Sequence, residues 1–352
     1  MMPELPPPTL RLRLDADALA SNWRVLDAMS GTAAAGAAVK ADAYGLGVDQ
    51  VLPALRGAGA QDFFVAHWSE VPDVTAHVPP AQLSVLHGPV HRQDADYARQ
   101  TGVRPVINSL DQAGLWLAGG GGPCDLMIDT GINRLGVAMH DIHDAVLARL
   151  DVVTLMSHLA SADEDSAFNE AQLGRFRTAA AAIPARRRSF ANSAGIALGA
   201  DYAFDLTRPG LALYGGVPRA EMAGTIRQVA WPQAAIIQRR QLQAGDSVGY
   251  NATFTADRPM VAGVISLGYA DGYLRCWSGK GALKSGDAML PLLGKVSMDM
   301  VVVDLGNASH LREGDWVDVP YDLHQASVTS GLSQYELLTG LGRRFRRKFQ
   351  QG

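Results

Sequence analysis

The chain has 352 residues, of which 47% are hydrophobic and 19% charged, and this composition is typical of a globular protein of about two domains. A formal net charge of −4 gives no electrostatic reason to expect nucleic acid or a membrane surface as a partner. The two cysteines, Cys124 and Cys276, lack the spacing of a disulfide framework or a zinc site, and we expect no metal. Without a signal-peptide core or a membrane-length apolar stretch, the sequence predicts a cytoplasmic protein.

From about residue 10 to 215, short apolar or β-branched runs alternate with longer segments of helical spacing, such as 109–118 and 164–182. This alternation predicts parallel strands joined by helices. The expected strands are 34–40, 62–66, 82–86, 103–107, 125–129, 152–158, 188–192 and 204–208. Eight successive units of this kind favour a closed (β/α)8 barrel of the TIM type over an open sheet.

After about residue 225 the helical spacing stops, and turn signals such as Ala244-Gly245-Asp246 separate the apolar runs. The expected strands here are 232–240, 247–250, 259–267, 290–293, 296–304 and 315–320. We therefore predict two domains, a barrel over residues 1–225 and a mostly-β domain over residues 226–352.

Lys40 ends the first expected strand and is followed by a turn with two glycines, Gly45 and Gly47. In a barrel this position lies at the catalytic end of the strand. Partial desolvation there would lower the pKa of the lysine and favour a Schiff base with a carbonyl compound. Taken alone, the residue is better explained as an ordinary lysine whose ammonium group reaches solvent from a strand end.

Four further strand ends carry polar residues, and the loops of a barrel would bring them together. They are Asp129–Arg134, His158, Asn192–Gly195 and Arg208–Gly210. A hydroxyl group and backbone amides at the last two strand ends suit a phosphate group. The basic clusters 186–188 and 343–348 lack a nucleic-acid-binding motif, and we interpret both as solvated surface.

A specific resemblance extends over nearly the whole chain. The motifs that carry it, in order, are VKADAYGLG at 39–47, DTGINRLG at 129–136, SHLASADE at 157–164, ANSAG at 191–195, RPGLALYGG at 208–216, GYADGYLR at 268–275 and GKVSMDM at 294–300. The sequence resembles the alanine racemases in these motifs and in their order. The resemblance implies a barrel that binds pyridoxal 5′-phosphate, followed by a β-domain.

The resemblance also implies roles for the residues that match the motifs. Lys40 would hold the cofactor covalently, Arg208 would face its pyridine nitrogen, and His158 would support Arg208 through a hydrogen bond. An arginine at the ring nitrogen would weaken the ring as an electron sink. The phosphate and its surroundings would be held by Tyr44, Asn192, Ser193, the amides of Gly210 and Leu211, and Tyr335.

Tyr269 would be a second catalytic base, because racemisation needs a proton donor on each face of a planar carbanion. In the family this tyrosine, and the methionine that matches Met298, come from the neighbouring subunit. The resemblance therefore implies a homodimer with composite active sites, in which Tyr269 acts on L-alanine and Lys40 on D-alanine. Nearby cations such as His158 and Arg208 would lower the pKa of Tyr269.

One departure concerns Arg134, which would contact the substrate carboxylate. Family members often carry a modified lysine that orients this arginine, and Met127 occupies the matching position here. We hypothesise that a bound anion or a neighbouring carboxylate replaces the missing partner.

The expected function is the interconversion of L- and D-alanine, either to supply D-alanine for peptidoglycan or to degrade it. Alternatives are a related pyridoxal-phosphate enzyme, such as a serine or broader-specificity racemase or an amino-acid decarboxylase, and a non-catalytic carrier of the cofactor. The decarboxylases lack the GYADGY arrangement, and the carriers resemble the barrel alone. Tyr269 and residues 226–352 therefore argue against both.

Overall fold

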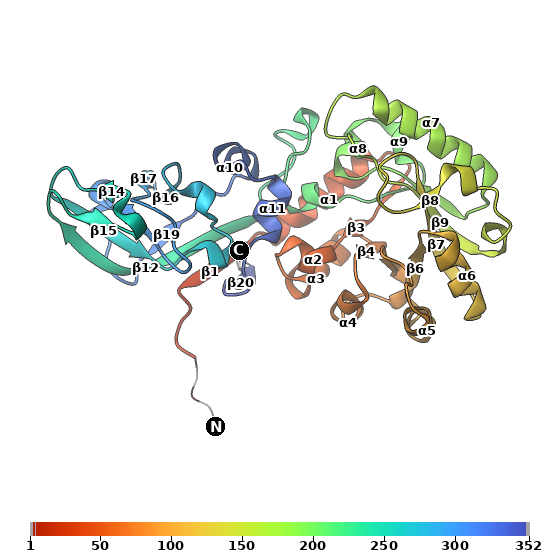
Figure 1. Cartoon of the computed structure of the whole chain (residues 1–352), viewed down its shortest axis with the longest axis horizontal. Coiled ribbons are helices and arrows are strands. Elements are labelled where there is room, and N and C mark those ends of the chain that lie inside the picture. Colours follow the sequence, from red (N-terminus) through yellow and green to blue (C-terminus); the bar gives the residue numbers. More distant parts are fainter. Residues whose placement is uncertain (1–2, 4, 350–352) are drawn as a thin grey trace. The chain divides into compact units, whose positions relative to one another are not determined.

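The computed structural model describes residue 3 and residues 5–349. It consists of two compact units (Figure 1). The first is contiguous and spans Asp17–Arg227; we call it the barrel unit. The second combines the described residues up to Ala16 with those from Gln228 onward, and we call it the β-rich unit.

Parallel strands form the centre of the barrel unit. They are β2 (Ala34–Ala35), β3 (Ala37–Ala38), β4 (Phe63–Val65), β5 (Leu83–Val85), β6 (Arg104–Ile107), β7 (Pro123–Asp129), β9 (Asp151–Met156), β10 (Arg187–Ser189) and β11 (Leu206–Thr207). The ladder runs from β3 through β10, β11 pairs in parallel with β2, and the Arg208 amide donates to the Ala191 carbonyl at 2.8 Å. We count β2 and β3 as one interrupted strand. The pairing of β11 with β2, and the hydrogen bond between Arg208 and Ala191, then close the predicted eight-stranded barrel.

Helices connect the strands, as the spacing predicted. They are α1 (Ala16–Met29), α3 (Val48–Ala58), α4 (Val71–Thr75), α5 (Arg92–Thr101), α6 (Leu110–Ala118), α7 (Ala167–Ala182), α8 (Ser193–Ala197) and α9 (Ala200–Ala203). The start of α7 is three residues later than the expected 164 because Ser166 caps it, its side chain accepting from the Phe168 amide. No helix among the described residues is long and apolar enough to cross a bilayer.

The amino ends of the barrel strands hold a buried network of charged groups. Asp125 on β7 is fully buried and accepts hydrogen bonds from the Ser84 hydroxyl at 2.6 Å and the Thr154 amide at 3.0 Å. Arg104 lies 3.4 Å from the same carboxylate. Buried charges are tolerated only when they are paired in this way.

We expect Asp125→Ala to destabilise the barrel by about 3 kcal/mol, because it leaves the buried Thr154 amide without its acceptor and removes one of the two carboxylates beside Arg104. Urea unfolding followed by circular dichroism would measure the change. Asp151→Ala is the matched control, since Asp151 pairs with Arg186 at the surface and such pairs contribute about 1 kcal/mol or less. Equal losses in the two variants would contradict the assignment.

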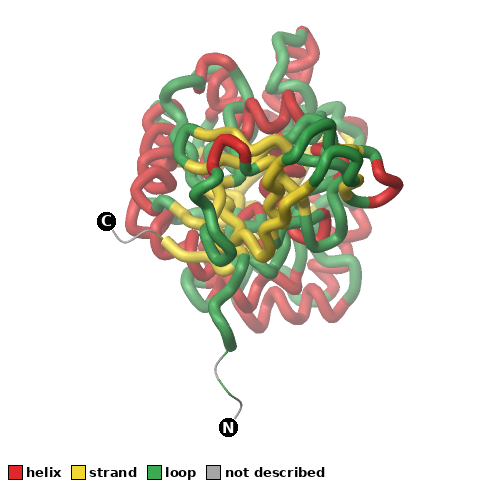
Figure 2. Tube along the Cα trace, turned by 90° about the vertical axis from the view of Figure 1, so that its left-hand side faces the viewer, coloured by secondary structure: helices red, strands yellow, loops and turns green. Residues whose placement is uncertain are grey.

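The β-rich unit is built on an eight-stranded sheet. Its strands are β1 (Leu10–Leu14), β12 (Ala230–Leu242), β15 (Met260–Ile265), β16 (Ala282–Ser285), β17 (Ala288–Pro291), β18 (Val301–Asp304), β19 (Trp316–Asp318) and β20 (Arg346–Phe349). The main order is β17-β16-β19-β12-β1-β20, and β15 lies between β12 and β18. Figure 2 looks onto this unit, whose residues are mainly strand and loop.

Three smaller features complete the β-rich unit. A hairpin joins β13 (Ser247–Val248) to β14 (Phe254–Thr255), and two helices follow β19, α10 (Leu323–Ser330) and α11 (Gln334–Thr339). Strand β1 is antiparallel to β12 and parallel to β20. Residues 10–14 thus pair within the β-rich sheet, whereas the sequence-based division assigned all of residues 1–225 to the barrel.

Candidate active site

The polar residues expected at the site lie after the carboxyl ends of the barrel strands. Lys40 follows β3, His158 follows β9, and Arg208 follows β11. The electrostatic neighbours of Lys40 are Arg134, Glu70 and Arg208, which shows that these loops converge. Burial, and next the positive charge of Arg134, lower the pKa of Lys40. The neutral, nucleophilic fraction of the Lys40 amine near pH 7 is therefore larger than that of an ordinary lysine.

The segment after Lys40 is a left-handed turn. The four residues Ala41–Tyr44 have φ between 52° and 56°, although none of them is glycine. This conformation costs about 1–2 kcal/mol per residue, so surrounding contacts must hold it. Gly45 at φ 83° ends the turn, and the Asp42 side chain accepts from the Val48 amide at 2.8 Å, which fixes the start of α3.

Glu70, which the sequence analysis did not single out, holds the start of this turn. One carboxylate oxygen accepts from the Ala41 amide, and the other accepts from the amides of Ala66 at 2.8 Å and His67 at 2.9 Å. Glu70 also raises the pKa of Lys40, against the larger effect of burial. The residue therefore fixes both the backbone beside Lys40 and part of the charge around it.

We expect Glu70→Gln to slow the capture of pyridoxal phosphate by the cofactor-free protein about tenfold, because the neutral amide accepts fewer hydrogen bonds. Loss of the carboxylate also lowers the pKa of Lys40, so the half-maximal pH of capture should fall. Stopped-flow absorbance across a pH series measures both. Glu170→Gln, on the exposed face of α7, is the control; an unchanged pH midpoint in Glu70→Gln would contradict this role.

Tyr44, Ser193 and Gly210 meet in a small cradle. The Ser193 hydroxyl oxygen accepts from the amides of Gly210 at 2.9 Å and Ala212 at 3.2 Å, which leaves its own proton free to donate. A Cβ atom at Gly210 would collide with the Tyr44 hydroxyl, so only glycine allows this approach. The Tyr44 ring packs on Tyr214 at 4.8 Å between centroids, and Tyr214 donates to the Ala38 carbonyl.

Asn192 has a supporting position in the cradle. Its side chain accepts from the Gly195 amide at 2.8 Å and caps α8, whose first residue is Ser193. The donors around Ser193 and Gly210, together with the Tyr44 hydroxyl, fit a phosphate group. The cradle therefore matches the phosphorylated end of pyridoxal phosphate.

Arg208 is buried and held by two bonds that the sequence analysis missed. It donates to the Ser189 hydroxyl and, at 2.5 Å, to the Ser157 carbonyl. Burial lowers the pKa of Arg208 to about 10, so it remains a cation near pH 7. Within the described residues, no hydrogen bond joins His158 to Arg208.

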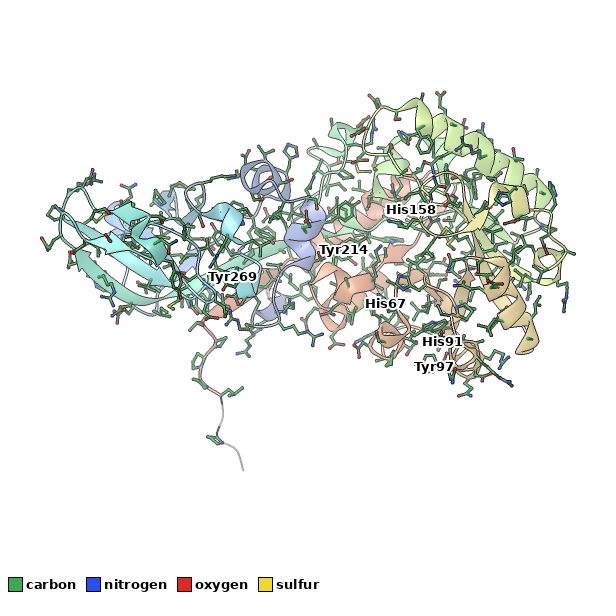
Figure 3. The ribbon with its side chains drawn as sticks, in the orientation of Figure 1. His67, His91, Tyr97, His158, Tyr214 and Tyr269 are labelled. Atoms are coloured by element: carbon green, nitrogen blue, oxygen red, sulfur yellow. The ribbon has the colours of Figure 1, made fainter. Side chains whose placement is uncertain are left out.

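His158 lies in the barrel unit in a positively charged neighbourhood (Figure 3). Burial, and then the charges of Arg208 and Arg134, lower the pKa of His158 to about 3. The imidazole is therefore neutral near pH 7. His158 is therefore not a cation near pH 7, contrary to our expectation.

Met127 packs into the apolar interior of the barrel, against a cluster formed by Phe64, Val106, Met156 and Leu206. Arg134 lies in an exposed loop whose backbone is held by Asp129, which accepts from the Arg134 amide at 3.2 Å. Within the described residues the Arg134 guanidinium makes no ion pair with a carboxylate. Asp129 therefore binds the Arg134 backbone, and the ion pair between a carboxylate and the guanidinium group that we hypothesised is not formed among the described residues.

In the β-rich unit, where Figure 3 labels Tyr269, backbone hydrogen bonds join this residue to the segment that contains Met298. The Tyr269 amide donates to the Ser297 carbonyl and the Ala270 amide donates to the Met298 carbonyl, both at 3.0 Å. A Cβ atom at Gly268 would collide with these carbonyls. The Met298 side chain is 53% exposed, and Arg275 lies over the Tyr269 ring at 5.3 Å.

Arg344 fixes the loop around Tyr269, although the sequence analysis placed it in a solvated basic cluster. It binds the buried Asp271 carboxylate through two bonds, of 2.7 and 2.9 Å, and binds Asp299 at 2.7 Å. Asp271 in turn accepts from the Gly268 amide at 2.9 Å. One arginine thus connects the segments that carry Tyr269 and Met298. Tyr335, the other residue expected from this unit, is 45% exposed on α11.

Residues 14–218 match the alanine racemase N-terminal domain, and residues 229–349 match the alanine racemase C-terminal domain. The chain belongs to the alanine racemase family. Its relatives include the biosynthetic alanine racemase of Agrobacterium fabrum, 40% identical over 97% of this chain and 93% of the relative, and the catabolic enzyme of the same organism, at 38% identity over 97% and 92%.

Solved structures of the family are also similar. An alanine racemase from Bartonella henselae, with covalently bound pyridoxal phosphate, has a TM-score of 0.91 and 33% identity and covers 98% of this chain and 100% of its own. The biosynthetic alanine racemase of Pseudomonas aeruginosa has a TM-score of 0.88 and 31% identity with the same coverage. These likenesses support the barrel and the mostly-β domain predicted for this family member.

Proposed function

We propose that the protein interconverts L- and D-alanine with pyridoxal phosphate, using Lys40 and Tyr269 as its two bases. The observation that carries the proposal is the position of Lys40, at a barrel strand end beside Arg134 and Arg208, with a lowered pKa. Lys40 is also the only lysine in Asp17–Arg227. Covalent attachment of a carbonyl cofactor in this unit therefore has one candidate amine.

When bound, the cofactor supplies an electron-withdrawing ring that acidifies the substrate's α-carbon. Tyr44, Ser193 and the amide of Leu211 would hold its phosphate, with Tyr335 as a further contact. The Gly210 amide, which donates to the Ser193 hydroxyl oxygen, would share its hydrogen with the phosphate. Arg208 would lie at its ring nitrogen, where the bonds to Ser189 and Ser157 keep the guanidinium group in place.

In the reaction itself, the Lys40 amine would take or return the α-proton of D-alanine, and the Tyr269 phenol would do so for L-alanine. Arg134 would bind the substrate carboxylate, and Met298 would limit the space for the substrate's side chain. The lowered pKa of Lys40 suits a base that works near neutral pH. Because no carboxylate neutralises Arg134 among the described residues, we retain a bound anion as its partner.

A chiral assay of the purified protein, with alanine, serine and other amino acids, tests the substrate. We expect alanine to be racemised faster than serine. Preferred racemisation of serine would support the related serine racemase instead, and no turnover of either would overturn the proposal. Relatives named biosynthetic and catabolic are about equally similar to this chain, so the assay should measure both directions.

The active sites would be composite, in a homodimer that works in the cytoplasm. Each site would combine the barrel unit of one subunit with the β-rich unit of the other. Cys124 and Cys276 are both free thiols, in agreement with a reducing compartment.

Mixing two inactive variants tests the composite arrangement. Subunits with Lys40→Ala and subunits with Tyr269→Phe would form hybrid dimers in which one site contains both defects and the other contains none. We therefore expect the mixture to recover activity after subunit exchange. Sites built within single subunits would each keep one defect, and a mixture that stays inactive although hybrids form would contradict the proposal.

A further inference from the structure

Four cations lie on one face of two neighbouring strands in the β-rich unit. The register places Arg11 beside Arg346 and Arg13 beside Lys348. Side chains alternate along a strand, so the intervening residues point to the opposite face and the four cations share this one. Neighbouring strands are about 4.8 Å apart, and like charges at adjacent positions repel. The sheet therefore carries a concentrated positive charge.

Among the described residues, no carboxylate pairs directly with these cations. Arg11 donates to the Gln233 side chain at 2.5 Å, and Gln233 donates to the Asp318 carboxylate. The Gln233 amide thus stands between the Arg11 guanidinium group and this carboxylate. Burial, and then the charge of Arg13, lower the pKa of Arg11, while Asp318 raises it.

Arg13 also has an unused donor. Its Nε atom is buried and has no hydrogen-bond partner among the described residues. Buried donors are nearly always satisfied in folded proteins. An acceptor supplied by a bound molecule would satisfy this one and would reduce the repulsion at the same time.

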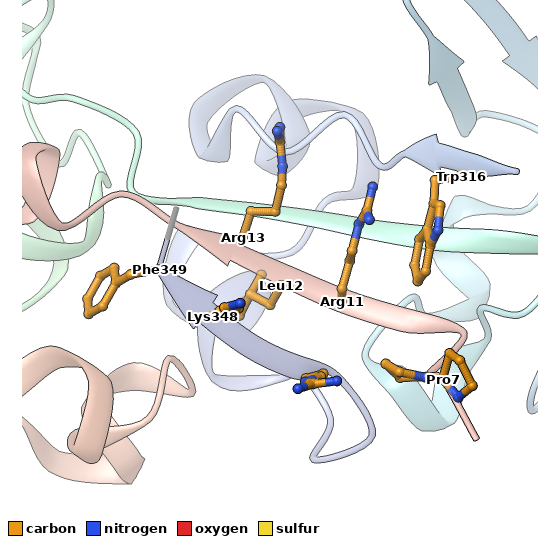
Figure 4. Close-up of a pocket in the computed structure, with 9 residues that line it drawn as sticks. Pro7, Arg11, Leu12, Arg13, Trp316, Lys348 and Phe349 are labelled. Carbon is orange, nitrogen blue, oxygen red and sulfur yellow. The ribbon is translucent and has the colours of Figure 1, made fainter. Parts of the chain in front are cut away.

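The cations line a cavity of about 500 Å³ (Figure 4). We call it the basic groove and define it by Arg11, Arg13, Trp316, Arg346 and Lys348. The Arg11 guanidinium lies 4.0 Å from the centre of the Trp316 ring, which holds it in place. This volume lies within the range of small-molecule sites.

Protection of an exposed sheet edge would explain part of the pattern. Charged side chains on an edge strand prevent pairing with other chains, and β20 ends the main strand order. Strand β1, however, is paired on both sides, with β12 and with β20. Edge protection therefore gives no reason for Arg11 and Arg13.

We propose that the basic groove binds an oligophosphate, either free or as the phosphate chain of a nucleotide. Linked phosphates carry several negative charges within a few ångströms, which matches the close spacing of the four cations. A guanidinium group can also donate two parallel hydrogen bonds to phosphate oxygens. A single carboxylate would leave most of the positive charge uncompensated. The basic groove is distinct from the proposed catalytic set, because none of the residues that define the groove belongs to that set.

Calorimetric titration of the cofactor-loaded protein with tripolyphosphate tests the proposal. We expect saturable binding of one molecule per chain, weakened at least about tenfold in Arg13→Gln/Lys348→Gln and weakened by added salt. Arg258→Gln/Lys280→Gln is the control, because it removes the same charge from exposed positions outside the groove. Lys348→Gln alone, at an exposed position, serves as a second variant should the double variant fail to fold.

Two sources of the phosphate chain are distinguished by repeating the titration with adenosine triphosphate, adenosine and orthophosphate. Tighter binding of the nucleotide than of tripolyphosphate would identify a nucleotide site, and equal binding would identify a site for the phosphate chain alone. Absence of saturable binding, equal weakening in the control, or binding of adenosine as strong as that of the triphosphate would each overturn the proposal.

Thermal unfolding gives an independent measurement. Without ligand, Arg13→Gln/Lys348→Gln should melt above the unchanged protein, because the substitutions remove two of the repelling charges. Tripolyphosphate should raise the melting temperature of the unchanged protein and leave that of the variant nearly constant. An equal rise in both proteins would contradict binding in the groove.

Discussion

Replacing Lys40 with alanine should reduce racemisation by more than about 10⁴-fold and remove the visible absorbance of covalently held pyridoxal phosphate. The size of the effect follows from two roles that one side chain would fill, cofactor attachment and proton transfer. Borohydride reduction of the unchanged protein should fix the cofactor to the peptide that contains Lys40, since the barrel unit has no other lysine. Absorbance, chiral chromatography and peptide mapping measure the three results.

Lys40→Arg is the matched comparison, because it keeps the positive charge and length of the side chain but not the nucleophilic amine. It should be as inactive as Lys40→Ala. Lys295→Ala, at a lysine of the β-rich unit, should leave the absorbance unchanged. Full activity in Lys40→Ala, or a reduced cofactor attached to another lysine, would exclude the mechanism.

Replacing Tyr269 with phenylalanine should slow racemisation by about 10²–10⁴-fold, and the loss should be unequal for the two isomers. If Lys40 serves D-alanine, its amine remains able to exchange the α-proton of that isomer with solvent. We therefore expect D-alanine to gain deuterium in heavy water much faster than it racemises, whereas exchange into L-alanine is lost. Proton NMR of the two isomers measures both rates.

Tyr250→Phe is the control for this variant, because Tyr250 belongs to the same unit and is 64% exposed. It should leave exchange into both isomers unchanged. Equal loss of exchange for L- and D-alanine in Tyr269→Phe would show that the tyrosine does not serve one face alone. The proposed division of labour with Lys40 would then be wrong.

The sequence predicted the barrel well because each strand and helix of that unit is encoded locally. The eight expected strands all correspond to observed ones, and β2 and β11 close the ladder. Residues 10–14 could not be assigned in the same way. Their alternating pattern predicts a strand, but the choice of sheet depends on partners at residues 230–242 and 346–349, far away in the chain.

The candidate site shows a similar limit. The motifs located Lys40 and Tyr269, but not Glu70 or Arg344, because carboxylates and arginines that bind backbone or neighbouring loops have no local signature. The left-handed turn was also beyond prediction. Alanine and tyrosine disfavour positive φ, so only contacts from the folded barrel select that conformation for Ala41–Tyr44.

The placement of β1 between β12 and β20 also sets an order of assembly. Synthesis delivers β1 before the barrel unit and β20 after it, so β1 must remain without its final neighbour while the residues between them are made. The barrel unit, which is contiguous from Asp17 to Arg227, has all its strands available long before that. We therefore expect the barrel to fold during synthesis and β1 to be the segment most dependent on chaperones until β20 has been made.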